Sequence, residues 1–170
     1  MSRFAIREAT LGDAEGIARA SSDSWRSSYR GILPDHVLDR IDIEHRADKR
    51  RAVLRDRSVF QLVAYDVTHG DIVGFCDAGP SRRNVTLAGE IYAIYLVHHA
   101  KRHGLGTEMF ERVSAWLRAN EMPSMIVWVL ANNTHARRFY EAMGGRVGTQ
   151  FRSAVSGYGV TEQAYVWDRI

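Results

Sequence analysis

Residues 90–145 decide the fold, and they read EIYAIYLVHHAKRHGLGTEMFERVSAWLRANEMPSMIVWVLANNTHARRFYEAMGG. The apolar run over 90–97 predicts a strand, and the segment 104–120 carries its apolar residues along one helical stripe. The apolar run 125–131 predicts a strand covered on both faces, and apolar residues at i, i+3, i+4 and i+7 over 136–143 predict a short helix that ends at Gly144. This order predicts a right-handed βαβ unit with two parallel strands.

The flanking sequence adds further strands and helices to this unit. On the N-terminal side we expect a strand at 5–7, a helix from Ala14, a bent helical segment over 25–38, a basic helix over 44–57 and an antiparallel hairpin formed by 59–65 and 72–77. On the C-terminal side, 146–151 and 162–167 are expected to form a final hairpin around the loop 153–159. The whole chain, 1–170, therefore predicts a single α/β domain with a mixed sheet.

Composition limits the possible functions. The chain has 170 residues, of which 45% are hydrophobic and 25% are charged, and its only cysteine is Cys76, so neither an internal disulfide nor a thiolate-rich metal site is expected. The chain shows no apolar signal core and no apolar stretch of membrane-spanning length, which predicts a cytoplasmic protein without a membrane partner. The net charge of +3 comes largely from 44–57, where acids and apolar residues but no aromatic residues are interleaved, so no nucleic-acid partner is expected.

The chemistry is expected where the first strand of the unit enters its helix, at 98–110, HHAKRHGLGTEMF. A helix N-terminus presents unpaired amides, and glycines let an anion approach the backbone closely. A dinucleotide fingerprint would require a third glycine where Met109 stands, and a P-loop would require Gly-Lys-Ser/Thr, which is absent. Taken alone, the Gly-x-Gly pattern fits an anion cradle or simply a tight turn.

The stretch 90–145 resembles the GCN5-related N-acetyltransferase (GNAT) family in the order and spacing of its motifs. The family's acetyl-CoA signature, Gln/Arg-x-x-Gly-x-Gly/Ala, falls on residues 101–106, KRHGLG, and its pattern Asn-x-x-Ala-x-x-x-Tyr falls on Asn133, Ala136 and Tyr140. The sequence departs from the family pattern at two positions. Lys101 stands where Gln or Arg is usual and keeps the charge of an arginine, and Gly145 is not followed by the usual Phe. The segments 6–18 and 25–34 resemble the opening of family members more loosely.

The resemblance implies a GNAT-like acyl-CoA N-acyltransferase fold, a central mixed, mostly antiparallel sheet with a splayed parallel strand pair, flanked by helices. It also implies acetyl-CoA as co-substrate, with its pyrophosphate on the amides of 102–107 and its pantetheine arm along the strand end. The cofactor-binding residues would be Leu96, Val97, Lys101, Arg102, His103, Gly104, Leu105, Gly106, Thr107, Asn133 and Tyr140. Asn133 is equally a good helix N-cap, and Tyr140, which would protonate the leaving thiolate, is equally a core residue.

An acceptor ammonium must lose a proton before it can attack the thioester. Glu90 lies eleven residues before Lys101, an offset that matches the catalytic glutamate of the histone-acetylating branch of the family, although it is also an ordinary strand-start residue. Tyr92 lies two residues after Glu90 and therefore shares its face of the strand. We expect Tyr92, Trp25, Tyr29 and Asp35 to line the side of the site that receives the acceptor. For Trp25 and Tyr29, the alternative is that they pack their helix onto the sheet.

These features predict an acetyl-CoA-dependent N-acetyltransferase that acts by direct attack of a primary amine, on a small molecule or a peptide. The alternative is a non-catalytic acyl-CoA-binding sensor or scaffold module, and the retained Glu90 and Tyr140 favour the enzyme. No metal is expected, and a homodimer is compatible with the sequence. The sequence does not distinguish among classes of amine acceptor.

Overall fold

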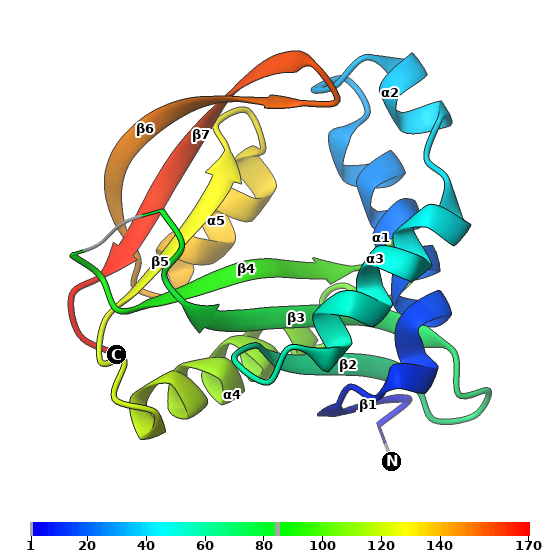
Figure 1. The fold of residues 1–170 in the computed structure, drawn as a ribbon, viewed down its shortest axis with the longest axis horizontal. Coiled ribbons are helices and arrows are strands. Elements are labelled where there is room, and N and C mark those ends of the chain that lie inside the picture. Colours follow the sequence, from blue (N-terminus) through cyan, green and yellow to red (C-terminus); the bar gives the residue numbers. More distant parts are fainter. Residues whose placement is uncertain (1, 84–85) are drawn as a thin grey trace.

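The computed structural model describes residues 2–83 and 86–170, which form a seven-stranded mixed sheet in the order β1-β2-β3-β4-β5-β7-β6 (Figure 1). The strands are β1 (Phe4–Glu8), β2 (Phe60–Asp66), β3 (Ile72–Pro80), β4 (Gly89–Leu96), β5 (Met125–Leu130), β6 (Arg146–Val155) and β7 (Tyr158–Trp167). The helices are α1 (Ala14–Tyr29), α2 (Asp35–Asp39), α3 (Ile43–Arg55), α4 (Leu105–Ala119) and α5 (Thr134–Ala142). Sequence periodicity therefore predicted the α/β class and the order of strands and helices correctly, although some of their bounds differ.

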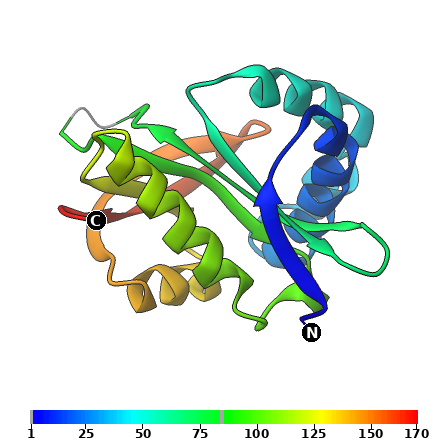
Figure 2. The same cartoon turned by 90° about the horizontal axis from the view of Figure 1, so that it is seen from below.

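Two helical layers enclose the sheet. α4 and α5 cover one face, and α1 and α3 cover the other (Figure 2). The apolar stripe of α4 is buried against the sheet through Leu105, Met109, Phe110, Val113 and Leu117, as its spacing predicted. Burial of this stripe fixes the N-terminus of α4 beside the end of β4.

The parallel pair β4–β5 separates after three residue pairs. Gly89–Ile91 lie opposite 125–127, whereas β4 continues to Leu96 paired with β3 but not with β5. On its other side β4 contains a bulge, because Asp77 of β3 pairs with Ala93 and the next β3 residue pairs with Ile91, which leaves Tyr92 without a partner. A bulge bends and twists the strand that carries it, so the strand pair opens at the bulge. The splayed parallel pair expected from the family resemblance is present.

The C-terminal hairpin is longer than the sequence predicted. Residues 153–159 were expected to form a loop, but β6 extends to Val155 and β7 begins at Tyr158. Only Ser156 and Gly157 form the turn, with φ values of 49° and 78°. Two consecutive positive φ values are those of a type I′ turn, whose twist matches that of the flanking strands, so pairing continues to the tip.

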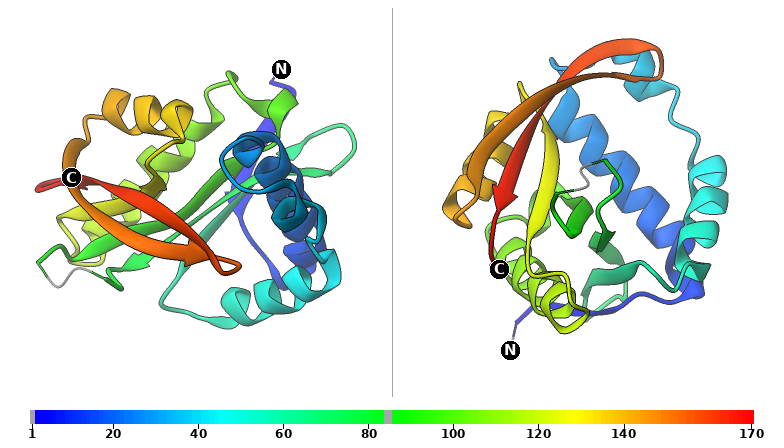
Figure 3. Two further views of the ribbon diagram at one scale, coloured as in Figure 1. Left: turned by 90° about the horizontal axis from the view of Figure 1, so that it is seen from above. Right: turned by 60° about the vertical axis from the view of Figure 1, so that its left-hand side comes forward.

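The tip of this hairpin reaches across the molecule to α2 (Figure 3). Val155 and Val160 pack against an apolar cluster formed by Tyr29, Leu33, Leu38 and Leu130. The far ends of β5 and β7 are therefore joined to the α1–α2 side of the sheet. Among the described residues, no helix has the length and apolar character needed to cross a membrane.

Candidate functional site

The N-terminus of α4, residues 104–107, forms an open backbone site that we call the cradle. Gly104 precedes the helix with φ 80°, in the left-handed region, and a Cβ built on it would meet no atom within 4 Å. The first four amides of an α-helix have no intrahelical partner and carry the positive end of the helix dipole. The N-terminus of α4 therefore combines open space beside its backbone, unpaired amides and positive potential. These are the features that bind a phosphate group.

The residues around the cradle differ in their availability to a ligand. Arg102 and His103 are exposed, and Arg102 has a φ of 67°, which is uncommon for a residue with a Cβ. Lys101 is half-buried, its ammonium lies 3.4 Å from the Ser28 hydroxyl on α1, and burial lowers its pKa. Thus Lys101 lies against α1, and Arg102 exposes its guanidinium at the turn, beside the exposed ring of His103.

Of the two residues expected to pair with a pantetheine arm, one has its backbone on the open edge of β4. Val97 was expected to pair with a pantetheine arm, but its N–H donates to the Val73 carbonyl at 2.9 Å and its carbonyl accepts from Ala100 at 3.1 Å. Because backbone groups alternate in direction along a strand, those of Leu96 point away from β3, toward the gap beside β5. The Leu96 carbonyl accepts a 3.3 Å hydrogen bond from Ser24 of α1. The expected pairing with the arm is therefore corrected for Val97, and for Leu96 it remains a prediction.

Asn133 and Tyr140 occupy the start and the inner face of α5. The Asn133 side chain accepts a hydrogen bond from the Ala136 amide at 3.1 Å, so it caps the helix through its oxygen and leaves its amide NH₂ for another partner. Tyr140 is 5% exposed and packs against Phe139, Tyr165 and Trp167. Burial raises its pKa well above the ordinary value, which keeps the hydroxyl protonated and able to donate.

Glu90 is buried beneath Arg82. One carboxylate oxygen of Glu90 accepts a 2.8 Å hydrogen bond from the backbone amide of Arg82, and the other oxygen lies 3.8 Å from the Arg82 guanidinium. Tyr92 lies on the same face, donates its hydroxyl hydrogen to the Pro80 carbonyl at 2.5 Å, and carries the Arg82 guanidinium 3.5 Å from its ring centroid. Gly79 makes room for this ring, since a Cβ there would be 2.7 Å from the Tyr92 oxygen. The bulged segment and the loop after β3 are thus joined through Arg82.

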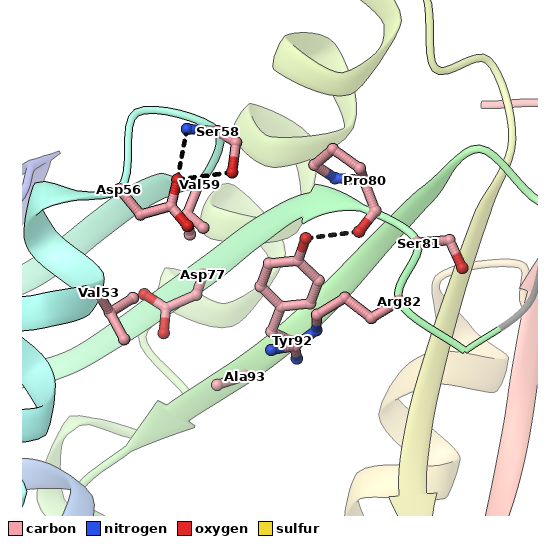
Figure 4. Close-up of a pocket in the computed structure, with 10 residues that line it drawn as sticks. All are labelled: Val53, Asp56, Ser58, Val59, Asp77, Pro80, Ser81, Arg82, Tyr92 and Ala93. Atoms are coloured by element: carbon pink, nitrogen blue, oxygen red, sulfur yellow. Dashed lines mark hydrogen bonds between the residues drawn. The ribbon is translucent and has the colours of Figure 1, made fainter.

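A cavity of about 460 Å³ lies beside the bulge on the α3 side of the sheet (Figure 4). The end of α3 and the segment after it form one wall, β3 with its following loop forms a second, and β4 forms the floor; the lining residues are Val53, Asp56, Ser58, Val59, Asp77, Pro80, Ser81, Arg82, Tyr92 and Ala93. Of the residues predicted to line the acceptor side, only Tyr92 belongs to this cavity. A cavity of this size next to the opening of the strand pair is suited to a small molecule.

Trp25 and Tyr29 lie farther along β4, in an aromatic group that includes Tyr95. The Tyr29 and Tyr95 hydroxyls are 2.9 Å apart, and the Trp25 and Tyr29 rings are in edge contact at 5.0 Å. Tyr29 is 6% exposed, so its side chain also packs in the core, as the alternative interpretation held. Asp35 lies at the first turn of α2, where it pairs with Arg30 at 2.9 Å.

Sequence reasoning missed three residues around the opening. Tyr95 is one; the others are Asp77, whose carboxylate accepts from Arg50 at 2.6 Å, and Arg82. A carboxylate inside the apolar run 72–80 is the signal that points to Asp77. Cys76, next to it, is fully buried, as its apolar surroundings predicted, and burial raises the pKa of its thiol. Within the described part of the chain, no group of three His, Cys, Asp or Glu residues is arranged to hold a metal.

Comparison with known proteins agrees with this geometry. The chain is 29% identical over 163 residues to the uncharacterized N-acetyltransferase YuaI of Bacillus subtilis (strain 168), which covers 95% of this chain and 91% of that protein. The PaiA N-acetyltransferase of Thermoplasma acidophilum, solved in complex with coenzyme A, has a TM-score of 0.71 at 16% identity and covers 96% of this chain and 98% of its own. An N-acetyltransferase of Staphylococcus aureus Mu50 also has a TM-score of 0.71 at 16% identity, and the match covers 98% of this chain and 99% of that one.

The two solved structures share the fold of this chain, with the mixed sheet and flanking helices described above. The sequence profile of the acetyltransferase (GNAT) family matches residues 20–145, a segment that includes the cradle, the splayed strands and α5. The chain therefore belongs to the acetyltransferase (GNAT) family.

Proposed function

We propose that residues 1–170 form one domain that transfers the acetyl group of acetyl-CoA to a primary amine by direct attack of the amine on the thioester. Acetyl-CoA is the co-substrate of this enzyme, in accord with its family and with the coenzyme A complex of the Thermoplasma relative. The observation that carries the proposal is the cradle at Gly104, which stands at the end of a strand whose free edge begins at the opening of β4 and β5.

Residues of this chain would hold acetyl-CoA by backbone groups. The amides of Gly104–Thr107 would bind the pyrophosphate, with Arg102 adding positive charge and the His103 ring beside it, and Leu96 would offer its backbone to the pantetheine arm. The NH₂ of Asn133, which donates to none of the described residues, is available to the same arm. Acetyl-CoA supplies an acyl carbon activated as a thioester when it is bound.

The reaction forms a bond between the amine nitrogen and the acyl carbon and breaks the bond from that carbon to sulfur. The ammonium must first lose a proton, which Glu90 would accept through water, since Arg82 covers its carboxylate. The sulfur leaves with the electron pair of the broken bond, and Tyr140 would donate a proton to it. The nitrogen loses its second proton to water as the amide forms, and Tyr140 regains a proton from water. The buried, protonated hydroxyl of Tyr140 is in the correct state for that step.

A panel of amines tests the proposal. Acetyl-CoA binding is measured by calorimetry, and release of free thiol is measured in the presence of primary amines, diamines, amino acids and peptides. Thiol release that depends on one amine class, with a matching acetylated product by mass spectrometry, is expected. Tight binding of acetyl-CoA with no amine-dependent release across the panel would instead identify a sensor or scaffold module.

A further inference from the structure

The cavity beside the bulge contains a buried carboxylate that the sheet does not require. Asp77 is 5% exposed in the middle of β3, where an apolar side chain would pack at less cost than a buried ion pair. Its Oδ2 accepts from Arg50 of α3 at 2.6 Å, and Oδ1 accepts no hydrogen bond from the residues that the structure describes. This oxygen is therefore available to a ligand in the cavity that Asp77 lines.

The same cavity contains a guanidinium that donates no hydrogen bond to the residues that the structure describes. The Arg82 side chain is 60% exposed, and its contact with Glu90, at 3.8 Å, is longer than a hydrogen bond. It lies flat on the Tyr92 ring, 3.5 Å from the centroid, which restrains the guanidinium without using its N–H groups. A restrained planar guanidinium is well suited to binding a carboxylate.

The two charges have different positions relative to the opening of the strands. Asp77 pairs with Ala93, next to the bulged Tyr92, and so lies where β5 departs from β4. Figure 4 shows the Arg82 side chain running from the loop after β3 to the Tyr92 ring, where its guanidinium lies 3.5 Å from the ring centroid. An amine held at Asp77 would therefore lie close to the opening, and an acidic group on the same molecule would reach Arg82.

We propose that this cavity binds the acceptor as a small molecule that carries both an ammonium and a carboxylate, with the ammonium on Asp77 and the carboxylate on Arg82. The inference rests on the proposed function and narrows its acceptor to an amino acid-like compound. The volume of about 460 Å³ agrees with a small molecule rather than with a folded protein.

Binding of matched compounds tests this inference without catalysis. Straight-chain ω-amino acids, and the monoamine, the diamine and the monocarboxylate of each chain length, are titrated by calorimetry into protein saturated with coenzyme A, which carries no acetyl group. For at least one chain length, the amino acid should bind about tenfold or more tightly than the other three compounds, because each charge-assisted contact adds to affinity. Equal or tighter binding of the monoamine or diamine at every length would overturn the inference.

Variants then assign each charge. Arg82→Gln should remove the tenfold preference for the amino acid over the monoamine, whereas Arg83→Gln should keep it, because Arg83 pairs with Glu162 and does not line the cavity. Asp77→Asn should weaken amino acid binding about tenfold and leave the monocarboxylate unaffected. Since Asp77→Asn leaves Arg50 buried without its partner, the double variant Asp77→Asn/Arg50→Gln is measured beside it, with melting temperatures for both. A preference that survives in Arg82→Gln would contradict the assignment.

The inference and the proposed function fail in different ways. If monoamines are acetylated and amino acids are not, the enzyme stands and the acceptor assignment is wrong. If coenzyme A does not bind, the proposed function itself is wrong.

Discussion

The substitution Gly104→Glu distinguishes the role of this residue in binding acetyl-CoA from its role in the stability of the fold. The residue at 104 has φ 80° and open space beside it, so a side chain there clashes with nothing but is held in the left-handed region. That conformation costs about 1–2 kcal/mol for a residue with a Cβ, which lowers the melting temperature of a chain of this size by roughly 2–8 °C. A carboxylate about 4 Å from a phosphate charge adds repulsion of about 1 kcal/mol in water and about 4 kcal/mol at an effective dielectric constant of 20.

The dissociation constant for acetyl-CoA should therefore rise about fivefold to a thousandfold, measured by calorimetry beside a thermal melt. Gly70→Glu is the matched control, since Gly70 has φ 78° with equally open space in the β2–β3 turn; it should show the same thermal shift and unchanged affinity. Gly104→Gln retains the size without the charge and should lose less affinity than Gly104→Glu. Wild-type affinity in a folded Gly104→Glu would refute the cradle.

Three further predictions concern proton-carrying groups. Tyr140→Phe should lower turnover by about 10²-fold or less with acetyl-CoA affinity intact; equal turnover in steady-state assays would return Tyr140 to a packing role. Glu90→Gln should lower turnover at neutral pH and recover partly as the pH approaches the amine pKa of about 10.4; a pH-independent loss with a lowered melting temperature would mean that Glu90 is structural. Arg3 and the Thr68 amide lower the pKa of Asp66 to about 2, below its unfolded value of about 3.9. Its contribution to stability is then present above about pH 4 and lost as the pH falls toward 2, so Asp66→Asn should flatten the fall in melting temperature across that window; an unchanged slope would contradict the pairing.

The sequence predicted the elements well because their signals are local. The stripe of α4 and the all-apolar run of β5 each identify an element without knowledge of its neighbours. The two-residue turn at Ser156–Gly157 was missed although Ser-Gly is a turn signal. Each of β6 and β7 is extended by pairing with the other, which the local sequence does not show.

The candidate site was predictable in part, at the glycine turn before α4 and at Tyr92, which lines the cavity. Gly104 and its helix follow from a local motif, whereas the cavity depends on the register of β3 with β4. The bulge at Tyr92 sets which side chains meet Asp77 and Arg82, and no period in the sequence reveals an unpaired residue. Val97 shows the same limit, since its amide is taken by Val73, a partner 24 positions earlier in the chain.

Burial of Cys76 has a practical consequence for measuring this enzyme. It is the only thiol in the chain, none of its surface is exposed, and its raised pKa keeps it in the unreactive neutral form. A colorimetric disulfide reagent added to the folded protein should therefore titrate only coenzyme A, so turnover can be followed continuously at high enzyme concentration with a flat baseline. The same reagent would report unfolding, because one equivalent of thiol per chain becomes reactive when the core opens.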